Sequence, residues 1–157
     1  MKSGDILVED SILNPTNRTR LVYPILYCYR HGLELAMKWV IAMFGQYADI
    51  CSSDHLDHDL WTLWAACKKI IFAVCSDDDE SNEALQAVQQ IVKDFHDWDR
   101  IAMAFRYSDD KNGIGFKLPD YPIDLSNIRS VMQAVGRFFF GVEGQLEDII
   151  ASGDFDI

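Results

Sequence analysis

The sequence is poor in basic residues: 14 Lys and Arg stand against 25 Asp and Glu, which gives a net charge of −11. A protein that binds nucleic acid on its own needs a basic patch, because the phosphate backbone has to be neutralised. Non-specific binding to DNA or to an anionic membrane is therefore disfavoured. Charge does not favour RNA binding either, although a local basic pocket or a basic partner chain would permit it.

Long apolar runs and paired cysteines are also missing. No stretch approaches the roughly 20 apolar residues of a membrane span, and Met1 to Asp5 lack the apolar run of a signal peptide. The four cysteines contain no Cys-x-x-Cys pair; they are Cys28, Cys51, Cys67 and Cys75. We interpret them as reduced thiols, three of them among apolar neighbours, in a cytoplasmic protein without membrane contact.

Several motifs of catalysis and cofactor binding are absent. The chain has no glycine-rich phosphate loop and no Gly-x-Ser-x-Gly elbow. None of the four histidines follows a Glu by three residues, which excludes the di-iron pattern of helical bundles. Cys51, His55 and His58 could hold a metal, but a polar capping loop is the favoured interpretation. We therefore expect no metal and no cofactor.

Apolar residues make up 49% of the 157 residues, enough for the core of one domain. We expect a single domain over residues 1–157, with a loosely ordered arm at 1–19 and a tail at 152–157. Apolar residues at helical spacing predict four long helices, over residues 21–47, 58–75, 80–107 and from Asp124 onward. The predicted fold class is all-α, an antiparallel four-helix bundle.

The connections carry further signals. Asp57 is predicted to cap the second helix, and Asp124 to cap the last, with Ile123 and Ile128 as a hydrophobic staple. Asn112-Gly113 predicts a short β-hairpin or loop insertion between the third and fourth helices. The 108–122 loop is longer than a helix connection needs and is a candidate functional element. The first helix is apolar on opposite sides, which indicates a central position or a shared subunit interface.

One polar stripe interrupts that first helix. Arg30, His31, Glu34 and Lys38 fall within about 100° of arc. Arg30–Glu34 and Glu34–Lys38 have the i,i+4 spacing of ion pairs. One interpretation is the solvent face of the helix, and the other is a polar groove that meets His58 or the Arg106-Tyr107 pair.

The segment Tyr29 to Lys38, followed by Leu56 to Trp64, resembles HEPN proteins. In that superfamily a first helix of the type Arg-His-x-x-Glu-Leu-x-x-Lys precedes a second helix opened by a His-Asp-Leu-like stretch. Phe105 to Tyr107, the Asp-rich turn and Ile123 to Leu125 are similar to bacterial HEPN-type proteins as well. The resemblance implies a helical bundle, homodimerisation, and a role in prokaryotic toxin–antitoxin or antiphage systems.

Many HEPN proteins are metal-independent ribonucleases whose motif is an Arg followed, after a short spacer, by a His near the dimer interface. In such a site His supplies acid–base catalysis and Arg stabilises phosphate charge. In this sequence the positions five to seven residues before each of the four histidines hold no Arg. No catalytic residue is therefore carried over by position.

Two hypotheses follow. The first is a non-catalytic HEPN-like interaction protein that forms a homodimer or a larger assembly, with or without a partner chain. The second is a ribonuclease with a rearranged site. Its candidate catalytic residues are Arg30, His31, His58 and Arg106, and its candidate binding residues are Glu34, Lys38 and Tyr107. Ligand or nucleotide sensing in a cleft of the bundle is a third interpretation, supported only by the polar stripe.

Overall fold

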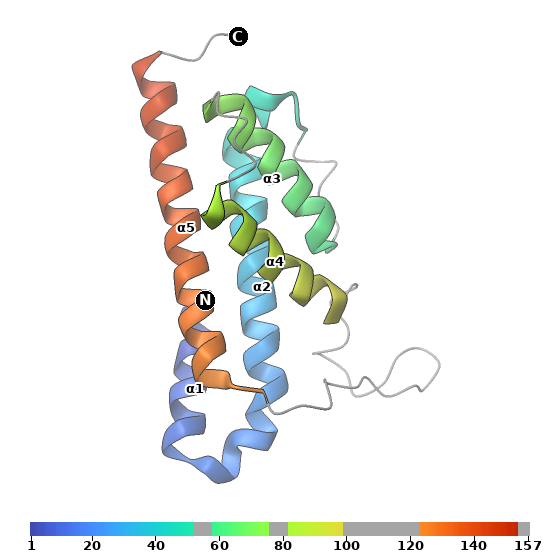
Figure 1. Ribbon diagram of the computed structural model, residues 1–157, viewed down its shortest axis with the longest axis vertical. Coiled ribbons are helices and arrows are strands. Elements are labelled where there is room, and N and C mark those ends of the chain that lie inside the picture. The colour runs from blue at the N-terminus through green and yellow to red at the C-terminus, as the bar shows by residue number, and fades with distance from the viewer. Residues whose placement is uncertain (52–57, 76–81, 99–122, 154–157) are drawn as a thin grey trace, which may run out of the picture.

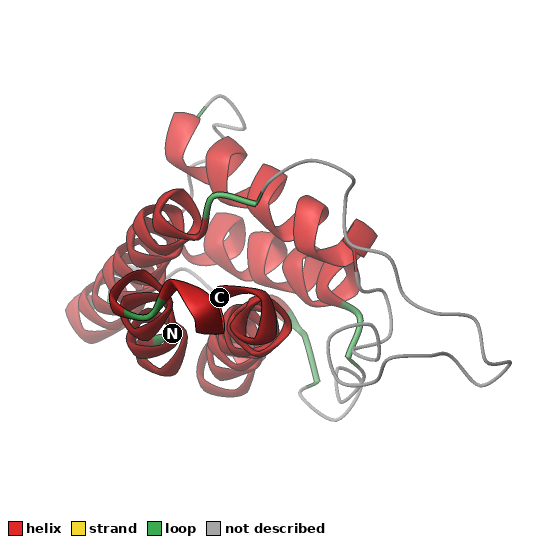
Figure 2. Ribbon diagram, turned by 90° about the horizontal axis from the view of Figure 1, so that it is seen from below, coloured by secondary structure: helices red, strands yellow, loops and turns green. Residues whose placement is uncertain are grey.

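The computed structural model describes residues 1–51, 58–75, 82–98 and 123–153. Every regular element in those ranges is helical, which confirms the all-α prediction (Figures 1 and 2). The elements are α1 (Lys2–Leu13), η1 (Pro15–Asn17), α2 (Arg18–Phe44), η2 (Gly45–Ala48), α3 (Leu60–Cys75), α4 (Glu83–Trp98) and α5 (Leu125–Ser152). None of the described helices is long and apolar enough to cross a membrane.

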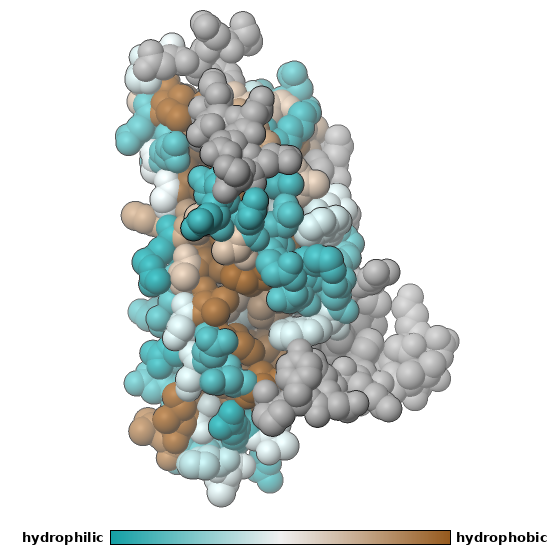
Figure 3. All heavy atoms as spheres, viewed as in Figure 1, coloured by the Kyte–Doolittle hydropathy of each residue, from teal (hydrophilic) through white to brown (hydrophobic). Residues whose placement is uncertain are grey.

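Helix α2 is central, because α1, α3 and α5 all pack against it (Figure 1). Its buried side chains recur at three- and four-residue steps from Ile25 to Phe44, as the periodicity predicted. They include Leu26, Leu33, Met37 and Val40, each with at most 1% of its surface exposed. Figure 3 shows apolar residues gathered along the middle of one face of the molecule, with hydrophilic residues at its edges.

The directions of the helices differ from a simple antiparallel bundle. Helices α3 and α4 are antiparallel neighbours: Asp59 lies near His96, and Trp64 near Gln89. Helices α2 and α5 run in the same direction.

Two hydrogen bonds show that α2 and α5 run in the same direction. The Arg18 guanidinium donates to the Ile123 carbonyl, and the Trp39 indole N–H donates to Glu143. The antiparallel prediction is therefore wrong for α2 and α5. The antiparallel prediction is also wrong for α2 and α3. His58 lies beside Arg30 and Glu34, while Cys67, further along α3, donates to the Met37 carbonyl, further along α2. The prediction assumed that α3 would turn back along α2.

The predicted loose arm at residues 1–19 is wrong, because residues 2–13 form α1. The helix lies antiparallel to the first half of α2, with Gly4 against the ring of Tyr29. The Tyr29 hydroxyl donates to Asp5 Oδ1 at 2.8 Å, and Val8 is fully buried. The buried positions of α1 are Gly4, Val8 and Ser11. Because only Val8 is strongly apolar, the helical period was not visible in the sequence.

The other boundaries lie close to the predicted ones. Helix α3 begins at Leu60, and its first turn is capped by Asp59, whose Oδ1 accepts from the Thr62 N–H at 2.7 Å. The predicted cap Asp57 lies outside the described residues. Helix α4 is described as far as Trp98. The rest of the predicted third helix, the 108–122 loop and the predicted hairpin lie outside the described residues.

Helix α5 begins where the sequence predicted. Asp124 Oδ1 accepts a hydrogen bond from the Asn127 N–H at 3.0 Å, which confirms Asp124 as the N-cap. Ile123 and Ile128 both pack against the core. Ser152, the first residue of the predicted tail, still belongs to α5, and Gly153 follows it with a φ of 74°. Residues 154–157 lie outside the described part of the chain.

Two glycine substitutions test the docking of α1. Gly4→Ala should lower the free energy of unfolding by about 1–3 kcal/mol, because its Cβ would lie 2.6 Å from the Tyr29 ring. The matched change Gly141→Ala should raise it by about 0.5–1 kcal/mol, because alanine favours a helix and its Cβ meets nothing within 4 Å. Urea unfolding followed by circular dichroism measures both. Stabilisation by both variants would contradict the docking of α1 on Tyr29.

Candidate functional site

Arg30 and Glu34 form an ion pair inside the protein, one helical turn apart on α2. They are 1% and 2% exposed, and Arg30 Nη1 donates to Glu34 Oε2 at 2.9 Å. Buried charges need partners, because removing them from water is costly. The interpretation of the polar stripe as a solvent face is therefore wrong for both residues.

The stripe meets His58, which lies just before α3. The Arg30 Nη2 group donates to the His58 carbonyl oxygen at 2.6 Å. His58 Nδ1 lies 2.7 Å from Glu34 Oε1. These contacts join segments 28 and 24 residues apart in the sequence. Of the predicted alternative, the contact between the stripe and His58 is therefore confirmed.

Lys38 completes the cluster, which we call the Glu34–His58 site (Arg30, Glu34, Lys38 and His58). Lys38 Nζ donates to Glu34 Oε1 at 3.0 Å. Burial by itself raises the pKa of the Glu34 carboxyl. The hydrogen bonds from His58 and Lys38 and the charges of these two residues outweigh that effect, so the pKa lies below its ordinary value. Glu34 is therefore held as a carboxylate.

The arrangement suits His58 for acid–base chemistry. Because a carboxylate only accepts hydrogen bonds, the contact with Glu34 places a proton on His58 Nδ1. In the neutral ring Nε2 then carries the lone pair. The His58 side chain is 55% exposed, while Glu34 is shielded. This is the pairing of an orienting carboxylate with an accessible imidazole that general acid–base catalysis uses.

The remaining candidates lie apart from this cluster or outside the described residues. The His31 ring stacks on Tyr27, with ring centroids 5.8 Å apart and planes 4° from parallel. Within the described residues, its buried Nδ1 has no hydrogen-bond partner. Arg106 and Tyr107 lie outside the described residues. Of the seven predicted residues, the structure brings together Arg30, Glu34, Lys38 and His58.

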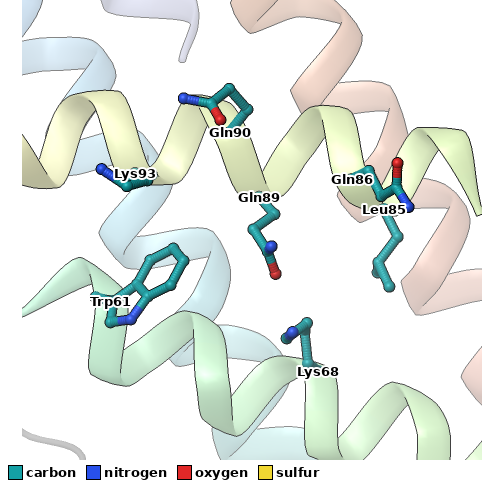
Figure 4. Close-up of a pocket in the computed structure, with 7 residues that line it drawn as sticks. All are labelled: Trp61, Lys68, Leu85, Gln86, Gln89, Gln90 and Lys93. Carbon is teal, nitrogen blue, oxygen red and sulfur yellow. The ribbon is translucent and has the colours of Figure 1, made fainter. Parts of the chain in front are cut away.

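A second hollow, the α3–α4 cleft, was not predicted from the sequence. It has a volume of about 410 Å³ and is lined by Trp61 and Lys68 of α3 and by Leu85, Gln86, Gln89, Gln90 and Lys93 of α4. In Figure 4, Lys68 and Gln89 point into the space between the two helices, whereas Gln90 points away from α3. The sequence did not indicate that α3 and α4 would line a common cleft.

No metal site is found among the described residues, and the buried Cys67 is not a reactive cysteine. Within the described ranges, no group of three or more His, Cys, Asp or Glu side chains is arranged to hold a metal. The predicted alternative with His55 includes residues 52–57, which lie outside those ranges. Among the described residues, Cys28 and Cys67 are free thiols, as expected. Burial raises the pKa of the Cys67 thiol, which makes it an unreactive core residue.

In comparisons with known proteins, no family model, no curated protein and no solved structure matches the chain.

The buried ion pair generates a prediction about stability. Glu34→Gln should lower the free energy of unfolding at neutral pH by about 3–5 kcal/mol, because Arg30 would stay buried without its carboxylate. Asp97→Asn, which breaks the exposed Lys93–Asp97 pair, is the matched control and should cost less than about 1 kcal/mol. Urea unfolding measures both. Equal losses in the two variants would contradict the buried pairing.

The same variant has a defined pH dependence. Because folding lowers the pKa of Glu34, its contribution is complete above the pKa of the unfolded chain and is lost as the pH falls through the folded-state pKa. The stability gap between the wild type and Glu34→Gln should therefore narrow only in acid, below the ordinary pKa of 4.5. Urea midpoints measured across acidic and neutral pH test this. A gap that already narrows near neutral pH would contradict it.

Proposed function

We propose that the protein is a HEPN-like helical interaction protein that forms a homodimer and serves as a component of a prokaryotic defence or toxin–antitoxin system. The observation that supports dimer formation is an exposed apolar surface, the open face, made of Leu35, Trp39 and Met43 of α2 and Phe140 of α5. These four side chains are between 44% and 78% exposed. The role in defence, in the cytoplasm, is supported by the sequence resemblance alone.

The open face is one continuous surface across two helices. Leu35, Trp39 and Met43 are spaced four residues apart and share a side of α2. The Trp39 indole N–H donates to Glu143 Oε1 at 2.9 Å, which connects α2 to α5. Phe140 is one turn before Glu143 and therefore lies on the same side of α5. The four residues carry no charge, and the neighbouring carboxylate is already hydrogen bonded.

The open face continues the surface that α1 covers. Gly32 of α2 and Gly136 of α5 both lie against Met1, at the end of α1. Beyond these glycines the same sides of α2 and α5 continue to Trp39 and Phe140, which are exposed. Figure 1 shows α1 beside the lower parts of α2 and α5 only. The buried half of this surface shows that it packs well against a helix.

A second copy of the chain is the occupant that we propose. Each copy has a net charge of −11, so two copies repel one another wherever charged surfaces meet. The open face avoids that repulsion, because its four side chains are uncharged. A two-fold axis would bring the open faces of both copies together and exclude water from two tryptophans and two phenylalanines. A larger assembly or a separate partner chain would use the same surface.

The architecture that we propose for this family type is a four-helix bundle of α2, α3, α4 and α5, with a hairpin or loop insertion before α5. The packing of α2 with α3 and α5, and of α3 with α4, supports it. The common direction of α2, α3 and α5 replaces the antiparallel order for these helices. Helix α1 is then an addition to the bundle.

The oligomeric state tests the proposal. Light scattering should give twice the 18.0 kDa chain mass for the wild type. Phe140→Lys should weaken the dimer by at least about tenfold, because a charge would enter the apolar contact. The matched control is Ile6→Lys on α1, a side chain that is 58% exposed but outside the open face. It should leave the mass unchanged. A wild type that stays monomeric at high concentration would contradict the proposal.

A metal-independent ribonuclease is the second candidate, favoured by the contact between Glu34 and His58. His58 Nε2 would take the proton of an RNA 2′-hydroxyl as its oxygen attacks the phosphorus and the 5′-oxygen leaves. Lys38, with a quarter of its side chain exposed, would stabilise the phosphate charge. Arg30 is buried and would position Glu34. His31 lies outside this site, and Arg106 and Tyr107 remain untested candidates.

An RNA-cleavage assay in EDTA tests this second candidate. Cleavage should persist in the chelator and fall by at least about a hundredfold in His58→Ala, because the proton acceptor is removed. His31→Ala is the matched control and should retain activity, since His31 lies apart from the Glu34–His58 site. No cleavage by the folded wild type, or full activity in His58→Ala, would exclude His58 as the catalytic base.

A further inference from the structure

The α3–α4 cleft is cationic in a protein that is strongly acidic. Its described lining contains two lysines, Lys68 and Lys93, and no Asp or Glu. In the whole chain acidic residues outnumber basic ones by 25 to 14. A cleft without carboxylates in such a chain is suited to an anionic ligand.

The two lysines are not equivalent. Lys93 donates to Asp97 one turn along α4, so its charge is partly neutralised. Lys68 forms no ion pair with any described residue, and in Figure 4 its side chain points into the cleft. Lys68 is therefore the group that would bind a phosphate.

The cleft also contains an aromatic surface. Trp61 is 40% exposed and lies at the same end of the cleft as Lys93 (Figure 4). His96 packs near its indole, with ring centroids 6.5 Å apart. Nucleobases stack on exposed aromatic rings of this kind.

Gln89 supplies an oriented amide between these two groups. The Trp64 indole N–H donates to Gln89 Oε1 at 3.2 Å, which orients the amide. The Gln89 amino group then remains as a donor. In Figure 4 the side chain points from α4 into the cleft, between Trp61 and Lys68. An amide in this position can hydrogen bond to the edge of a base or to a ribose.

We propose that the α3–α4 cleft binds a mononucleotide, with the base stacked on Trp61, the phosphate bound by Lys68 and Gln89 between them. The volume of about 410 Å³ is within the range of small-ligand sites and suits one nucleotide. The inference goes beyond the proposed dimer, because the cleft lies on α3 and α4 and the open face on α2 and α5. The nucleotide-binding proposal and the dimer proposal can therefore be confirmed or contradicted independently.

Isothermal titration of the full chain with adenosine 5′-monophosphate tests the proposal. Lys68→Gln should weaken binding about tenfold or more, because a charge-assisted hydrogen bond to phosphate is lost. Lys69→Gln is the matched control: it removes the same charge from the next residue of α3, which does not line the cleft. It should change the affinity less than twofold. Trp61→Leu should weaken binding by about tenfold through loss of stacking.

Component ligands separate the parts of the site. Adenosine and inorganic phosphate should each bind at least tenfold more weakly than the nucleotide, because each uses only one half of the cleft. Phosphate that binds as tightly as the nucleotide would overturn the proposal in favour of a simple anion site. Single-stranded RNA that binds far more tightly would overturn it in favour of a polymer.

Two further results would also overturn the proposal. One is the absence of binding heat from a wild type that circular dichroism shows to be folded. The other is an equal loss of affinity in Lys68→Gln and Lys69→Gln, which would indicate only a general charge effect.

Discussion

The ion pair between Arg30 and Glu34 is the constraint on which the rest of the structure depends. Both charged side chains extend from α2 into the interior of the protein, where removal from water is costly unless every polar atom has a partner. The carbonyl and ring of His58 and the ammonium of Lys38 supply those partners. His58 is thereby held against α2, and Asp59 next to it caps α3. The position of α3, and with it one wall of the α3–α4 cleft, follows from this contact.

Acidic residues outnumber basic ones by 25 to 14, so described surfaces that lack carboxylates are informative. The open face on α2 and α5 consists of uncharged apolar groups, and the described lining of the α3–α4 cleft combines lysines, amides and one indole. An excess of charge of one sign discourages non-specific association between copies of a chain. We therefore expect contacts with partners or ligands at the open face and at the α3–α4 cleft. The Glu34–His58 site differs from both, because its carboxylate is buried and its imidazole is exposed.

Helices with a strong apolar stripe could be predicted from the sequence, and those with a weak stripe could not. Helix α2 and helix α5 begin within three residues of the predicted positions, and the Asp124 cap is as predicted. Helix α1 was missed because it buries Gly4, Val8 and Ser11, of which two are small and weakly apolar. Such a helix exists because α2 and α5 leave room for a backbone that approaches closely at Gly4. The space that α1 fills is set by how α2 and α5 pack, so the sequence of α1 alone could not reveal it.

The sequence by itself determined the helical class, the acidic surface and the spacing of Arg30, Glu34 and Lys38 on one side of a helix. These are local properties, because composition and a period of 3.6 residues act within one segment. Only the tertiary structure decided whether that side faced water, and whether His31 or His58 joined it. His31 follows Arg30 directly and points elsewhere, whereas His58 lies 24 residues beyond Glu34 and touches it. Periodicity gives the angle of a residue around its own helix, but a contact depends on where the other helices pack.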